Sequence, residues 1–217
     1  EHGRAAGLVR GARGRRLRPL LQTGNGLTVT WKARLAEQLG AFTVEAHQLR
    51  AGRALLDPQA LAALTAIAAL LRPLPERQPY PALFAALDVV LENLEDPALL
   101  PALYVRWEVT LLAALGFALD LDSCARANTA DTKCAMPLAH VSPRTGRAVC
   151  AAHGAAYADR LLPLPAFLTA GVATGLTRLP AREDVATGLA LTGHFLVRHV
   201  FDDDPARLPI ERQRLSR

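Results

Sequence analysis

The residues best suited to chemistry are cysteines and a histidine in the second half of the 217-residue chain. Cys150 and His153 stand three positions apart in the stretch RTGRAVCAAHG, and Cys124 lies twenty-six residues before Cys150. Cysteine and histidine with two residues between them form one of the ligand spacings found in zinc sites. Three interpretations stay open at this point: a zinc site, the remains of one, or ordinary core residues.

The segment that carries these residues is irregular. Between 120 and 160, Asn, Asp, Thr, Pro and Gly interrupt the helical pattern, and all 3 cysteines of the chain lie there. An odd number of cysteines at wide spacing argues against a secreted disulfide framework and favours a reducing, cytoplasmic setting. The sequence has no run of 18 consecutive apolar residues, so it predicts no membrane span. The sequence lacks a Gly-rich phosphate loop, HExxH and Gly-x-Ser-x-Gly, so its signals for catalysis are weak.

Most of residues 54–217 have helical periodicity. Asp57-Pro58 predicts a helix start, because an acidic cap is followed by proline at the first helical position. Pro73 is expected to end that helix. Further helices are predicted at 83–94, 104–115, 164–176 and 181–201.

The helix predicted at 104–115 has a wide apolar face, which is typical of a central, buried helix. Arg106 and Glu108 are expected to point away from the core, and Gly116 is a natural residue just after the helix end. The tail DDDPARLPIERQRLSR, 202–217, is expected to be polar and frayed.

The first quarter reads as strands. Residues 27–35, LTVTWKARL, alternate in polarity: Trp31 shares an apolar face with Leu27 and Val29, and Lys32 and Arg34 share the other. Trp31 could be a base-stacking platform, but its place on the apolar face favours packing in the core. AFTVEAH repeats the pattern, and AAGLVRG is a weaker candidate. The chain opens on Glu1 rather than Met, so we expect a small β-barrel that lacks its first strand. A five-stranded barrel is a common platform for nucleic acids.

Positive charge is concentrated in the same quarter. Residues 1–53 hold ten Lys/Arg and three acids, a net charge of +7, so a total of +5 leaves −2 for the remainder. Such residues can form a solvated loop or contact phosphates; the scarcity of acids favours phosphate contacts. The predicted DNA contacts are Arg10, Arg13, Arg15, Arg16, Arg18, Lys32 and Arg34.

Four stretches together resemble the RecO family, in particular its proteobacterial members. The most specific is the phrase E-x-x-LL-x-x-LG-[FY]-x-L-D-L-x-x-C, carried here from Glu108 to Cys124. The start of the chain is similar to the family's N-terminal barrel after its first strand. The stretches are YVRWEVTLLAALGFALDLDSCA (104–125), HVSPRTGRAVC (140–150), YADRLLPLPAFL (157–168) and LTGHFLVRHV (191–200).

The resemblance implies an α+β protein with two domains. An OB-type basic barrel at 1–53 would precede a helical domain at 54–217 with a zinc-finger-like insertion at about 120–160. It implies a non-catalytic recombination mediator of the RecFOR DNA repair pathway, cytoplasmic in bacteria and associated with the nucleoid during repair. Such proteins bind single- and double-stranded DNA and anneal complementary strands. With RecR they help to load RecA on DNA coated by single-stranded-DNA-binding protein, whose C-terminal tail they bind.

The resemblance also bears on the cysteines. In zinc-bearing members the loop carries two Cys-x-x-Cys pairs, whereas here position 127 is Ala and the second pair reads Cys150-Ala-Ala-His153. Cys134 could supply a fourth ligand beside Cys124, but it lies in a stretch that looks inserted. We therefore favour a degenerate site in which Cys150 packs as a small apolar residue, and keep zinc as the alternative.

Two other classes of function remain as alternatives. The first is a helical adaptor whose basic head binds an acidic protein segment. The second is a metal- or thiol-dependent hydrolase centred on Cys150 and His153, although nothing nearby in the sequence suggests a third, orienting group.

Overall fold

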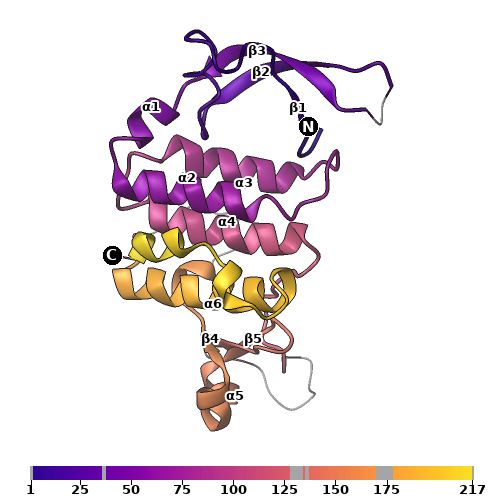
Figure 1. Cartoon of the computed structure of the whole chain (residues 1–217). Coiled ribbons are helices and arrows are strands. Elements are labelled where there is room, and N and C mark those ends of the chain that lie inside the picture. The colour runs from indigo at the N-terminus through magenta and orange to yellow at the C-terminus, as the bar shows by residue number, and fades with distance from the viewer. Residues whose placement is uncertain (1, 36–37, 128–133, 135–136, 170–177, 217) are drawn as a thin grey trace.

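A small β-sheet at the N-terminal end stands over a stack of helices, and a second small sheet lies on the far side of that stack (Figure 1). The computed structural model describes all residues except 1, 36–37, 128–133, 135–136, 170–177 and 217. The strands are β1 (Gly7–Leu8), β2 (Gly26–Lys32), β3 (Gly40–Gln48), β4 (Leu138–Val141), β5 (Ala148–Cys150) and β6 (Leu162–Pro163). The α-helices are α1 (Ala51–Ala54), α2 (Pro58–Leu70), α3 (Pro81–Glu92), α4 (Leu100–Ala114), α5 (Ala151–Gly154) and α6 (Arg182–Val200). Short 3-10 helices cover Ala155–Arg160, Ala166–Leu168, Pro205–Arg207 and Ile210–Ser216. The α+β class is confirmed.

The N-terminal sheet has the strand order β1-β3-β2, with β2 and β3 antiparallel. The described residues form an open, three-stranded sheet rather than a closed barrel. Trp31 pairs with Phe42, so the two aromatic residues lie on one face, as the alternation predicts. The expectation that this face packs into a core is wrong, because Trp31 is 38% exposed and Val29 is 52% exposed. The face instead lines a groove of about 1180 Å³, which Phe84 of α3 also lines.

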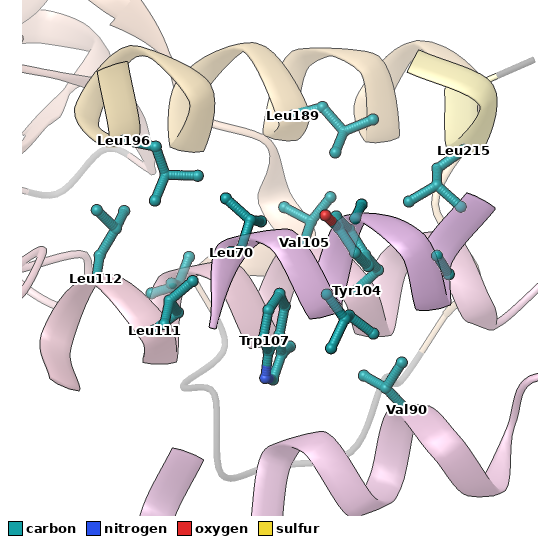
Figure 2. Packing of buried hydrophobic residues seen from close by; sticks show 14 of the residues in the cluster. Leu70, Val90, Tyr104, Val105, Trp107, Leu111, Leu112, Leu189, Leu196 and Leu215 are labelled. Atoms are coloured by element: carbon teal, nitrogen blue, oxygen red, sulfur yellow. The ribbon is translucent and has the colours of Figure 1, made fainter. Parts of the chain in front are cut away.

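The main core is built around α4, which packs against α3 and α6. Figure 2 shows Tyr104, Trp107 and Leu111 of α4 among residues of the neighbouring helices such as Leu70, Val90 and Leu189. The three α4 side chains are at most 1% exposed. Truncating one buried leucine of such a core to alanine costs about 2–5 kcal/mol. This core therefore holds together the helices on whose opposite sides the two sheets lie (Figure 1).

Local signals set the helix ends as predicted. The Asp57 carboxylate accepts hydrogen bonds from the backbone N–H of Gln59 at 2.7 Å and of Ala60 at 3.1 Å, and so caps α2. Helix α2 ends at Leu70, ahead of Pro73. Gly116 follows α4 with a φ of +91°, a conformation that glycine adopts without strain.

The centre of α4 holds a buried ion pair that the sequence pattern did not predict. Arg106 and Glu108, expected to point outward, are 5% and 0% exposed. Arg212 donates to both Glu108 carboxylate oxygens, at 2.5 and 2.7 Å, and Thr192 donates to the same carboxylate at 2.5 Å. Although burial disfavours the charged guanidinium, the Glu108 carboxylate raises the pKa of Arg212. The expectation of a frayed tail is therefore wrong: residues 210–216 form a 3-10 helix that packs on α2 and α6, with Leu215 buried.

The irregular segment at 120–160 contains a β-hairpin that docks on α6. Its sheet has the order β5-β4-β6. At the hairpin turn, the Pro143 carbonyl accepts a hydrogen bond from Arg198 at 3.2 Å and lies 3.3 Å from His194 Nε2. Of the helix predicted at 164–176, the described part forms one 3-10 turn at Ala166–Leu168, and residues 170–177 lie outside the described residues.

Candidate nucleic-acid interface and metal-ligating cluster

A basic pocket lies on the N-terminal sheet. It has a volume of about 590 Å³, and its charged lining residues are Arg10, Arg16, Lys32 and Arg34. All four side chains are exposed, and none of the described lining residues is acidic. Four cations around one cavity, with no carboxylate among its described lining residues, are well suited to bind phosphate oxygens.

Two parts of the chain bring these cations together. Lys32 ends β2, where it pairs with Ala41, and Arg34 follows two residues later. The other two arginines come from the loop between β1 and β2, which turns back at Gly11, where φ is +74° and the Gly14 N–H donates to the Gly11 carbonyl at 2.8 Å. The Asn25 side chain closes the loop by donating to two of its carbonyls, both at 3.0 Å.

The structure brings together four of the seven predicted DNA contacts. Arg13, Arg15 and Arg18 are exposed on the same loop but do not line the pocket. Two further cations of the first quarter have structural partners: Arg4 pairs with Glu76 at 3.2 Å, and Arg50 pairs with Asp88 at 2.9 Å. These ion pairs tie the sheet to the helical part of the chain.

Sequence reasoning missed the aromatic groove next to this pocket. The Arg77 guanidinium lies 5.1 Å from the centroid of the Trp31 ring, within range of a cation–π contact. The groove and the basic pocket share Val9, Phe42 and Val44 as lining residues. Nothing in the sequence pattern pointed to Arg77, which belongs to the proline-rich connector between α2 and α3.

The second site is a cluster of four potential metal ligands. One ligand atom each of Cys124, Cys134, Cys150 and His153 lies within 4.8 Å of the others. His153 Nδ1 is 3.2 Å from the Cys150 sulfur, 3.4 Å from the Cys134 sulfur and 3.5 Å from the Cys124 sulfur. The Cys134 and Cys150 sulfurs are 3.7 Å apart.

These separations fit a tetrahedral zinc site. With Zn–S bonds of about 2.3 Å and Zn–N bonds of about 2.0–2.1 Å, the edges of a tetrahedron are about 3.8 Å between sulfurs and about 3.6 Å between sulfur and nitrogen. The edge between the Cys134 and Cys150 sulfurs is 3.7 Å, and the three sulfur–nitrogen edges are 3.2–3.5 Å. The sequence favoured a degenerate site, whereas the structure gathers four potential ligands that could hold a metal ion.

The surroundings of the sulfurs also suit a cation. Burial disfavours the Cys124 thiolate, but backbone N–H groups of Cys150 and Arg126 donate to it and lower the pKa of Cys124 to about 6. Desolvation and the neighbouring Cys124 and Cys150 sulfurs raise the pKa of Cys134 to about 12. A divalent cation at the centre would remove the repulsion that disfavours a second thiolate.

The same geometry disfavours a catalytic thiol. Cys150 is 1% exposed, so a substrate has no access to its sulfur. His153 Nδ1 faces three sulfurs at once, whereas a catalytic base would have one nucleophile and one orienting partner.

Among the described residues, the helices are too short or too polar to span a bilayer.

Comparisons with known proteins agree with the residue pattern. Residues 55–208 match the family model described as Recombination protein O C terminal. The chain is 47% identical over 215 residues to the DNA repair protein RecO of Methylorubrum extorquens, covering 99% of this chain and 85% of the relative. It is 50% identical over 200 residues to the DNA repair protein RecO of Methylobacterium nodulans, covering 92% and 79%. The corresponding protein of Agrobacterium fabrum is 48% identical over 200 residues, covering 92% and 75%.

No solved structure matches the chain. The family match covers most of the helical part, and the relatives extend the similarity through the basic N-terminal sheet. The chain therefore belongs to the RecO family.

Proposed function

We propose that the protein is a non-catalytic recombination mediator in DNA repair, which binds single- and double-stranded DNA and anneals complementary strands. The observation that carries the proposal is the basic pocket of Arg10, Arg16, Lys32 and Arg34. Membership of a family whose relatives are called DNA repair proteins supports it independently.

The pocket suggests how annealing would work. Two strands of DNA repel each other as polyanions, and a protein surface with clustered cations screens that repulsion and raises the local concentration of strands. Contacts to phosphate carry no base sequence, so binding should be non-specific. Residues 1–53 would form the DNA-binding domain and residues 54–217 the helical domain that supports it.

Family membership also supports the partners that we propose. These are RecR and the C-terminal tail of single-stranded-DNA-binding protein, with loading of RecA as the outcome. An adaptor that binds an acidic protein segment is the second candidate, because the same cationic pocket would attract carboxylates.

DNA binding and annealing across a salt series would test the function. If all four cations of the pocket contact phosphate, log K should fall by about 2.8 per tenfold increase in salt on single strands and by about 3.6 on duplex. A fluorescence anisotropy titration with labelled oligonucleotides gives this slope. An affinity that does not change with salt, or no binding at moderate salt, would favour the adaptor.

We further propose that the cysteine–histidine cluster holds one structural Zn²⁺. Thiolate and imidazole ligands select soft or borderline ions, and four closed ligands are typical of structural rather than catalytic zinc. When bound, the ion supplies a cross-link between the segment that follows α4 and the β5–α5 turn. Metal analysis of the purified protein should find about one zinc per chain that resists mild chelation.

A further inference from the structure

We propose that Cys134 is a relocated zinc ligand, which replaces the ligand that the turn at 124–127 lacks. This inference rests on the proposed zinc site and adds to it a ligand arrangement specific to this chain. It is based on the turn at 124–127, which offers one ligand, Cys124, and on Cys134, which comes from outside that turn and lies beside the other ligands.

The turn that begins at Cys124 has the backbone of a two-ligand turn. The Ala127 N–H donates to the Cys124 carbonyl at 2.9 Å, which closes a four-residue turn. The Cys124 sulfur accepts hydrogen bonds from the backbone N–H of Cys150, at 3.4 Å, and of Arg126. Two intervening residues are the shortest common spacing for two ligands of one zinc, so position 127 is where a second ligand would stand. Alanine offers none.

The second turn still has both of its ligands. Cys150 caps α5 in an extended conformation, with φ of −70° and ψ of 159°. The first turn of that helix brings His153 back toward the cap, so that its Nδ1 lies 3.2 Å from the Cys150 sulfur. Cys124, Cys150 and His153 alone would make a three-ligand site with one position open, which is the arrangement of catalytic zinc.

Cys134 closes that open position. Its sulfur lies 3.4 Å from His153 Nδ1 and 3.7 Å from the Cys150 sulfur, so it meets ligands of the other turn at the separations of a tetrahedron. Cys134 itself lies in neither a helix nor a strand, and the proposed coordination would hold it beside the other three ligands.

We expect that a cysteine at position 127 can replace Cys134 as the zinc ligand. Cys134→Ser should weaken zinc binding by at least about 10–100-fold, since that is the loss caused by changing a residue that only orients a ligand. Adding Ala127→Cys to Cys134→Ser should restore binding of one zinc per chain. The matched control is Ala125→Cys in the same Cys134→Ser background, which adds the same side chain two residues earlier and should not restore binding.

Zinc competition against a chromophoric chelator gives the affinity, and substitution with Co²⁺ gives the ligand set. Wild type and the Ala127→Cys rescue variant should show equally strong sulfur-to-cobalt absorption, and Cys134→Ser should show weaker absorption. Unchanged zinc affinity in Cys134→Ser would overturn the relocation while leaving the zinc site itself in place. Rescue by Ala125→Cys as well, or by neither variant, would also overturn it. Absence of zinc from the wild-type protein would overturn both proposals.

Discussion

The grouping of cations in one pocket makes a quantitative prediction that net charge alone does not make. We compare two triple variants that remove the same charge from the same part of the chain. Arg10, Arg16 and Arg34 line the pocket, whereas Arg13, Arg15 and Arg18 do not, and all six are exposed. Changing the first three to alanine should therefore weaken DNA binding far more than changing the second three.

The magnitude follows from counterion release. Four phosphate contacts give a slope of about −2.8 on single-stranded DNA, so a fourfold rise in salt should weaken wild-type binding about 50-fold. In the pocket variant only Lys32 remains, the slope falls to about −0.7, and the same rise in salt should weaken binding only about 3-fold. The control variant should keep a slope close to that of the wild type.

The assay is fluorescence anisotropy with a labelled oligothymidine between 50 and 200 mM salt. Far-UV circular dichroism of both variants would check that folding is unchanged; exposed substitutions of this kind usually alter stability by less than about 0.5 kcal/mol. Equal losses of affinity and slope in the two variants would refute the pocket as the phosphate site. They would show that the cations of the first quarter act only through their total charge.

Three predictions concern stability. Arg212→Met should destabilise the protein by about 3–5 kcal/mol in urea denaturation, because it leaves the Glu108 carboxylate buried and unpaired. Adding Glu108→Leu to this variant should recover much of the lost stability. No recovery would contradict this account. Asp57→Ala removes the cap of α2 and should cost about 1 kcal/mol in the same measurement, whereas a neutral result would mean that water replaces the cap. A strong zinc chelator should lower the Tm of the wild type and leave the Tm of Cys150→Ser unchanged; a wild-type Tm that does not respond would count against a structural metal.

Features set by neighbouring residues could be predicted from the sequence. The cap at Asp57, the glycine after α4 and the alternation along β2 each depend on a few consecutive positions. The structure contains all three as predicted. The burial of Glu108 could not be predicted, because its partner Arg212 lies 104 residues away. The exposure of Trp31 was missed for a related reason: alternation shows which side chains share a face but not what covers that face.

At the candidate sites, too, local features could be predicted from the sequence and tertiary ones could not. The charge count showed that the cations are concentrated in the first quarter, but the fold of the loop after β1 determines which of them share a pocket. Spacing identified Cys150 and His153 as a pair. The position of Cys134 beside them depends on tertiary structure, since a ligand from outside a short turn follows no fixed spacing.

The ion pair between Glu108 and Arg212 also has a consequence for the order of folding during synthesis. Helix α4 carries the largest side chains of the core, yet the described cation that pairs with its central carboxylate, Arg212, is synthesised 104 residues later. A buried charge without a partner is strongly unfavourable, so the core around α4 cannot be completed on shorter nascent chains. The helical part should therefore reach its native packing late, after the basic sheet has emerged.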